Sequence, residues 1–189
     1  MSYRYPLLPR LLVEARAYAV ESKEHTVTYE GWDASRFMER ATLGKFAQLW
    51  LAEFCRLNEI SHKADRSSPY EPDKQDLHIH GISVDCKASN MVSMWPQVSV
   101  NCDVNPVDAY FFFNISKNMD YIKPLGGLSH SQFIGWRVHV AKGQKIPETN
   151  LTQSYSQGSY FVDPKKLLSL DGFLSGAESR AQKSKEAAA

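Results

Sequence analysis

The sequence predicts an α/β protein with a mixed central β-sheet flanked by helices. Up to about residue 60, apolar side chains recur every three or four positions, as they do on one face of a helix. Between about residues 76 and 162 they alternate with polar ones or form short apolar runs, as in strands. The predicted order of helices, several strands and a last helix fits a layered α/β domain.

Composition favours one domain with its own core. The chain has 189 residues, of which 43% are hydrophobic and 12% aromatic. We expect a single domain over residues 1–174, with a helical part at about 6–60 and a sheet at about 76–170. The formal net charge is +1, so no overall basic field indicates a polyanionic partner.

Cysteine usage and hydropathy limit the remaining classes. The three cysteines, Cys55, Cys86 and Cys102, are far apart and form no CxxC pair, which argues against a disulfide framework and a structural zinc site. The N-terminal apolar patch is interrupted by prolines and arginines, which suits neither a signal peptide nor a membrane span. We expect a soluble, cytoplasmic protein, encoded by a bacterium or a phage, with no membrane partner.

Two helices are expected in the first third of the chain. The first covers residues 7–22, entered through Pro6 and Pro9, because proline is tolerated in a first helical turn. The second is long, covers residues 35–60 and is capped by Asp33 or Ser35. A polar loop with two prolines is expected at residues 61–75.

Further strands are expected after residue 90. They are "QVSVNC", "DAYFFFNI" and "FIGWRVHVA", with a loop around "PLGGLSHS" between the last two. Asp163 is expected to cap a last helix whose first residue is Pro164. The polar residues 175–189 are expected to be a disordered tail.

The stretch "DLHIHGISVDCK", residues 76–87, predicts a β-hairpin whose two-residue loop is His80-Gly81. In that register Leu77 faces Val84 and Asp76 faces Asp85. All the apolar side chains then share one face, while Asp76, Asp85 and Lys87 share the other.

Two carboxylates directly across a strand pair destabilise it unless a cation lies between them, because their Cβ atoms are about 5 Å apart. Mg²⁺ prefers one or two carboxylates together with water and substrate phosphate. Lys87 points to the same side, where its amine reaches a water or a phosphate oxygen. This set of groups predicts a site that cleaves phosphodiesters.

Asp76, the hairpin and Asp85-Cys86-Lys87 together resemble the PD-(D/E)XK nuclease superfamily, whose fold is that of many restriction enzymes. The resemblance extends, as an order of elements, over roughly residues 36–170. It implies that Asp76 and Asp85 bind the metal with help from the carbonyl of Cys86, and that Lys87 positions or activates the attacking water. It further implies a DNA endonuclease that uses Mg²⁺ or Mn²⁺ and leaves 5′-phosphate ends.

Two departures from the family pattern affect the expected site. A literal Pro-Asp pair exists at Pro72-Asp73, but Asp73 falls outside the hairpin, so the metal role goes to Asp76. Family members often carry a glutamate on the preceding helix, where "GKFAQ" offers Gln48. Gln48 is a weaker ligand that would orient a water. Glu39 and Glu53 are the fallback candidates for the helix glutamate.

Other interpretations remain open. Asp76 and Asp85 could be solvated carboxylates on an exposed sheet face, paired with Lys87. The chain could also be a nuclease-fold module that binds nucleic acid without useful catalysis, which the missing helix glutamate supports. His78 and His80 form an H-x-H pair that suits zinc or iron in a metalloprotein acting on a small molecule. Arg137 and His139 are candidate phosphate contacts. Double-strand cleavage would need a homodimer or two successive nicks.

Overall fold

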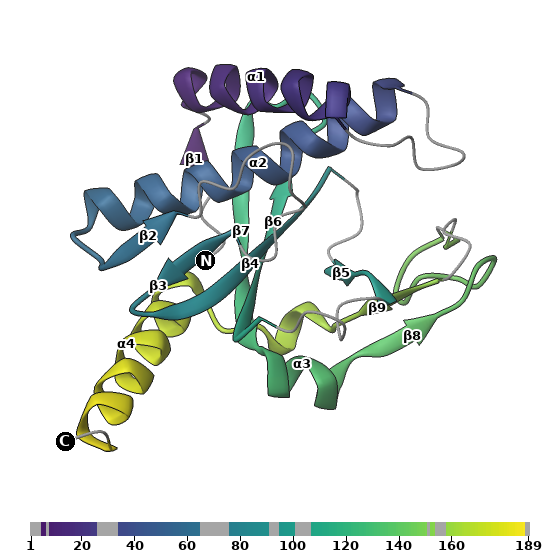
Figure 1. The fold of residues 1–189 in the computed structure, drawn as a ribbon. Helices are drawn as coiled ribbons and strands as arrows, with labels where there is room; N and C mark the ends of the chain where they lie inside the picture. The colour runs from purple at the N-terminus through teal and green to yellow at the C-terminus, as the bar shows by residue number, and fades with distance from the viewer. Residues whose placement is uncertain are drawn as a thin grey trace.

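A computed structural model describes residues 5–6, 8–25, 34–64, 76–90, 95–100, 107–150, 152–153 and 158–187. Within these ranges the chain forms two sheets and several helices (Figure 1). None of the helices described is both long and apolar enough to cross a bilayer. Cys102, Pro72 and Asp73 lie outside the described residues.

Two helices precede the sheet, as the apolar spacing predicts. Helix α1 spans Pro9–His25 and helix α2 spans Ala34–Leu57, and they lie side by side over the sheet (Figure 1). Both helix predictions are confirmed to within three residues at each end. The buried side chains of α2 include Phe46, Trp50 and Leu51, which pack onto the sheet.

The central sheet has six strands in the order β1-β7-β6-β4-β3-β2. Their bounds are Tyr5–Pro6 for β1, His62–Ala64 for β2, Leu77–Ile79 for β3, Ile82–Ser89 for β4, Ala109–Ile115 for β6 and Tyr121–Ser129 for β7. Strands β4 and β6 pair in parallel, whereas the other neighbours are antiparallel. The sheet is therefore mixed, and the predicted α/β class is confirmed.

Alternation along β6 divides the core between the two faces of this sheet. Phe111 and Phe113 point to the first cluster, which α1, α2 and the last helix cover. Tyr110 and Phe112 point to the second cluster, on the opposite face. The run "AYFFF" is buried on both sides, because a strand with helices on one face and a second sheet on the other has no solvated side.

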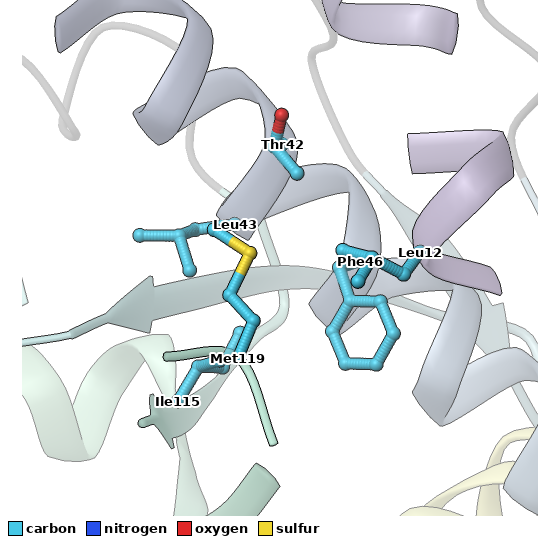
Figure 2. A pocket seen from close by; sticks show the side chains of 6 residues that line it. All are labelled: Leu12, Thr42, Leu43, Phe46, Ile115 and Met119. Atoms are coloured by element: carbon cyan, nitrogen blue, oxygen red, sulfur yellow. The ribbon is translucent and has the colours of Figure 1, made fainter. Parts of the chain in front are cut away.

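The first cluster is tightly packed where α1 and α2 meet the end of β6. Between α1, α2 and the end of β6, the side chains of Leu12, Phe46, Ile115 and Met119 meet and leave no room for a water molecule (Figure 2). This contact fixes α2 against the sheet, and thereby fixes where its polar side chains reach the strands.

The predicted hairpin is confirmed with its register. Leu77 pairs with Val84, His78 with Ser83 and Ile79 with Ile82. The turn residues have positive φ angles, 50° at His80 and 85° at Gly81, as a two-residue hairpin loop of this hand requires. Leu77, Ile79 and Val84 are buried in the first cluster, so the predicted apolar face is the inner one.

A second, three-stranded sheet has the order β5-β9-β8 and packs beside helix α3 over the second cluster. The bounds are Gln97–Val98 for β5, Val138–Val140 for β8, Ser159–Phe161 for β9 and His130–Trp136 for α3. Two predictions are wrong here. The "PLGGLSHS" loop is mostly strand β7, and "FIGWRVHVA" is a helix followed by a strand. The capping box of Ser129 and Gln132 starts that helix.

The C-terminal segment is also more ordered than predicted. Asp163 accepts a hydrogen bond from the backbone of Lys165 and caps the short 3-10 helix η2, Pro164–Lys166, as expected. Helix α4 then spans Leu170–Ala187. The prediction of a disordered tail from residue 175 is wrong, because Phe173, Leu174 and Ala177 are buried and anchor the helix from which the polar turns continue.

Strand β7 accepts the chain before α4 at two adjacent glycines. Gly127 of β7 forms an isolated antiparallel bridge with Leu168, which belongs to no strand. The N–H of Gly127 donates to the carbonyl of Leu168 at 3.0 Å, and the N–H of Leu168 donates to the carbonyl of Gly127 at 2.9 Å. A Cβ atom added at Gly127 would lie 2.5 Å from the Phe173 ring and 2.7 Å from the Phe111 ring. Only glycine therefore lets this segment dock on the sheet.

We expect Gly127→Ala to lower the free energy of unfolding by about 1–3 kcal/mol, because the added methyl group must displace two packed aromatic rings. Urea denaturation followed by circular dichroism measures the change. Gly135→Ala is the control, since a Cβ atom there meets nothing within 4 Å. Equal stability of Gly127→Ala and the wild type would contradict the close docking of α4.

Candidate active site

The motif residues lie where the central strand β4 passes the start of β3. Asp85 and Lys87 alternate with the buried residues Val84 and Cys86 along β4, so both point away from the first cluster. Their side chains are 21% and 36% exposed, respectively. Both are thus partly withdrawn from water while remaining open to a ligand.

Asp76 lies just before β3 and turns its carboxylate onto β4. Its Oδ2 accepts a hydrogen bond of 2.6 Å from the backbone N–H of Cys86. Its own N–H donates to the carbonyl of Val84 at 3.1 Å. The ladder of paired residues ends at Leu77, so Asp76 and Asp85 are not a ladder pair as the predicted register implies. The Asp76 carboxylate instead accepts the hydrogen bond that a backbone carbonyl of β3 would accept from Cys86 if the ladder continued.

Gln48 connects helix α2 to the same point. It is buried, and its Nε2 donates a hydrogen bond of 2.6 Å to the backbone carbonyl of Asp76. Phe46, Ala47 and Trp50 fix this part of the helix in the first cluster. Gln48 therefore holds the backbone of the first aspartate from the helix side, and the structure brings it together with the hairpin motif.

Lys87 forms an ion pair with Asp85, with 2.6 Å between Nζ and Oδ2. Burial acts to lower the pKa of Lys87, but the attraction of Asp85 and, more weakly, of Asp76 outweighs it and raises the pKa above its ordinary value. Lys87 is therefore charged at neutral pH. The three side chains carry one net negative charge.

Cys86 separates the two faces of the site. Its side chain is buried in the first cluster, as predicted for a thiol on the inner face. Burial, followed by the nearby charges of Asp76 and Asp85, raises the pKa of Cys86 well above its ordinary value. A neutral, buried thiol is a poor nucleophile, so only the Cys86 backbone is left to take part in the site.

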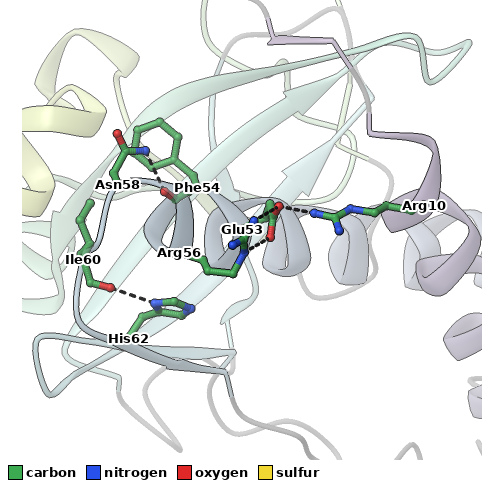
Figure 3. A network of polar contacts seen from close by, with 7 residues as sticks. All are labelled: Arg10, Glu53, Phe54, Arg56, Asn58, Ile60 and His62. Atoms are coloured by element: carbon green, nitrogen blue, oxygen red, sulfur yellow. Dashed lines mark hydrogen bonds and ion pairs between the residues drawn. The ribbon is translucent and has the colours of Figure 1, made fainter.

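The fallback glutamates make their contacts elsewhere. Glu39 accepts a hydrogen bond from the Asn90 side chain, beyond the end of β4. Glu53 pairs with Arg10 and Arg56 at an open hollow of about 280 Å³ between α1, α2 and β2 (Figure 3). Hydrogen bonds from Arg56 lower the pKa of Glu53. Of the three α2 candidates, Gln48 is the one that contacts the motif.

The histidine pair is divided between strand and turn. His78 lies on β3 opposite Ser83, whereas His80 occupies the left-handed turn position and its backbone N–H donates to Ser61. Among the residues described, no group of three or more His, Cys, Asp or Glu side chains is placed to hold a metal ion. The H-x-H interpretation therefore gains no third ligand within the described ranges.

Sequence reasoning missed the support that β6 gives to the hairpin. Asp108, just before β6, accepts hydrogen bonds of 2.7 Å from both the backbone N–H and the hydroxyl of Ser83. Tyr110 lies beside Asp85 in the parallel register, and its hydroxyl contacts Nδ1 of His130 at 3.2 Å. The parallel pairing creates these contacts, and no local pattern in the sequence encodes them.

We expect Asp76→Ala to cost about 1–3 kcal/mol of unfolding free energy, because it leaves the Cys86 N–H without its acceptor. Asp76→Asn keeps an acceptor oxygen and should cost distinctly less. Chemical denaturation of both variants measures the difference. Equal losses for the two variants would mean that the side chain does not hold β4 in this way.

We expect Cys55 and Cys86 to resist alkylation in the folded protein at pH 8. Burial raises the pKa of Cys55 to about 12 and that of Cys86 well above its ordinary value, so both thiols stay protonated and shielded. Iodoacetamide treatment with peptide mass spectrometry measures the modification, and urea-unfolded protein is the control. Rapid modification of Cys86 in the native state would contradict its inward position.

Comparison of the chain with protein-family models, with curated proteins and with solved structures finds no match. The candidate site is therefore defined by its own geometry. Gln48 from α2 binds the backbone of Asp76 at the entry to β3, and the Asp76 carboxylate binds the Cys86 N–H. Asp85 and Lys87 form their ion pair on the face of β4 that points away from α2.

Proposed function

We propose that this protein is a divalent-metal-dependent nuclease of the PD-(D/E)XK type, which hydrolyses phosphodiester bonds of DNA endonucleolytically. One observation carries the proposal. The preceding aspartate, Asp76, binds the backbone of the D-x-K element at Cys86, whose neighbours Asp85 and Lys87 form an ion pair. Gln48 of the long helix holds the Asp76 backbone from the α2 side of the sheet. A mixed sheet with this hairpin next to its parallel pair supports a restriction-endonuclease-like fold.

The donor set fits a hard divalent cation. Asp76 and Asp85 supply carboxylate oxygens and Cys86 a backbone carbonyl, the oxygen ligands that Mg²⁺ and Mn²⁺ take in proteins. Two carboxylates beside one lysine leave one negative charge in a half-buried place, which favours binding of a cation. When bound, the metal would stabilise the charge that develops on the phosphate and would make water a better nucleophile.

The protein's own groups have separable roles in this proposal. The raised pKa of Lys87 keeps its amine protonated, so it acts as a charged donor that holds a phosphate oxygen or the attacking water. The Cys86 N–H fixes the carboxylate of Asp76, while Gln48 fixes its backbone. In-line attack of the water opposite the 3′-oxygen would form one P–O bond and break the bond between phosphorus and that oxygen. The water would lose a proton to solvent and the departing 3′-oxygen would take one from solvent, which leaves 5′-phosphate and 3′-hydroxyl ends.

A second candidate is a nuclease-fold module that binds nucleic acid without cutting it. The ion pair between Lys87 and Asp85 favours this alternative, because it satisfies both groups without a metal. Gln48 in place of a helix glutamate points the same way, since an amide is a weaker ligand. The two candidates differ in one measurable property, namely turnover.

We expect the purified protein to convert supercoiled plasmid to nicked or linear DNA with Mg²⁺ or Mn²⁺, and not with EDTA. Asp85→Asn and Lys87→Gln should each lower the cleavage rate by at least about 100-fold, because each removes a charge next to the reacting phosphate. Gel electrophoresis of timed digests measures the rate, and end-labelling tests for 5′-phosphates.

The control substitutions remove one acidic and one basic side chain away from the site. Asp120→Asn and Lys183→Gln should cleave at the wild-type rate. DNA binding without cleavage in the wild type would establish the binding module and overturn the enzyme. Zinc or iron retained through purification, and lost in His78→Ala, would instead favour the H-x-H metalloprotein.

A further inference from the structure

The charges of the chain are unevenly distributed along the sequence. Residues 121–170 contain six Lys and Arg but only two Asp and Glu, although the whole chain has a formal charge of only +1. No acidic residue occurs between Asp120 and Glu148. This segment builds β7, α3 and two of the three strands of the small sheet, β8 and β9, so the excess positive charge belongs to one structural module.

Within this module, cationic side chains lie against aromatic rings. The guanidinium of Arg137 lies over the Tyr160 ring, 4.1 Å from its centroid. The rings of His139 and Tyr160 are in a T-shaped arrangement, with 5.5 Å between their centroids. The amine of Lys166 lies 5.7 Å from the centre of the Trp136 ring. An aromatic face holds a cation in place without neutralising its charge, whereas the carboxylate of Glu53 neutralises the charge of Arg56 with which it pairs.

The register of the small sheet turns this group toward the central sheet. Val98, Tyr160 and His139 are aligned across β5, β9 and β8, so their side chains share one face. Val98 and Tyr160 pack on the second cluster, together with Tyr110 and Phe112 of β6.

The same face of the central sheet carries the candidate site. Tyr110 and Phe112 are the parallel-register neighbours of Asp85 and Lys87. Side chains at neighbouring positions of paired strands point to the same side of a sheet. The basic module thus lies on the side of the central sheet that carries Asp85 and Lys87.

We propose that the face formed by Arg137, His139, Lys165 and Lys166 binds the sugar-phosphate backbone of the DNA strand that enters the candidate site. The inference rests on the proposed function in that the bound strand is the one to be cleaved. A polyanion suits the excess of positive charge, and the ring-held guanidinium of Arg137 presents planar donors to phosphate oxygens.

The test measures binding separately from cleavage. A fluorescein-labelled 20-base-pair duplex is titrated with the full chain in EDTA, and anisotropy gives the dissociation constant. We expect Arg137→Gln/Lys166→Gln to weaken binding roughly tenfold or more at about 0.1 M salt. The slope of log K against log salt should also become shallower by about two, one for each lost phosphate contact.

Matched controls separate this face from general charge. Arg180→Gln/Lys183→Gln removes two exposed cations from α4 and should change the dissociation constant less than twofold. Should loss of Arg137 disturb folding, as judged by circular dichroism, Lys165→Gln/Lys166→Gln alters two exposed side chains of η2 and should still weaken binding.

Three results would overturn the inference. They are wild-type affinity for the duplex in both variants of the module, an equal loss of affinity in the α4 control, and binding of heparin with no binding of the duplex. The last would identify a different polyanion. EDTA prevents cleavage, so the binding assay does not depend on catalysis. If binding depends on Arg137 and Lys166 but the protein never cuts plasmid, the proposed catalysis alone is refuted. Plasmid cleavage with no such dependence would refute this inference alone.

Discussion

The candidate site depends on the tight turn at His80-Gly81. Positive φ angles at both residues close the hairpin in one register, and a shift of one residue would exchange its buried and exposed side chains. The register places Cys86 in the core and Asp85 and Lys87 outside it. It also brings the Cys86 N–H to the carboxylate of Asp76. The placement of Cys86, Asp85 and Lys87 relative to Asp76 follows from this one backbone constraint.

Around the hairpin, the site is built from contacts of different strength. The aspartate that enters β3 is held from two directions, by the strand N–H and by the buried amide of Gln48. Lys87 is held by a single ion pair at a partly exposed position. Its flexible four-carbon side chain lets the amine move when the charges around it change. The site thus combines a fixed carboxylate with an amine that can change partners when a ligand arrives.

Local patterns predicted the parts of the fold that depend on local physics. Alternation in "DLHIHGISVDCK" predicted the hairpin register, and apolar spacing predicted α1 and α2.

The patterns failed where contacts between distant parts of the chain decide the structure. Residues 124–129 form a strand although Pro124 and two glycines favour a loop, because β6 pairs with them and α4 needs the bare backbone of Gly127. Apolar alternation in "FIGWRVHV" was misleading, since the capping box of Ser129 starts a helix there. Gln48 was selected by its place in a motif, but its bond to the Asp76 carbonyl is a tertiary contact that the sequence could not show.

The parallel pairing of β4 with β6 has a consequence for how the molecule is made. Residues 90–108, which join these strands, include β5 of the small sheet. Parallel neighbours need a long crossover, and contacts between distant parts of the chain form slowly. On a ribosome, the hairpin would emerge well before β6, and its inner face would have only α1 and α2 to cover it. The geometry of the candidate site would therefore be completed late, after β6 has joined the sheet and both layers have closed on it. A nascent chain halted at residue 90 would carry the motif without its supporting strand.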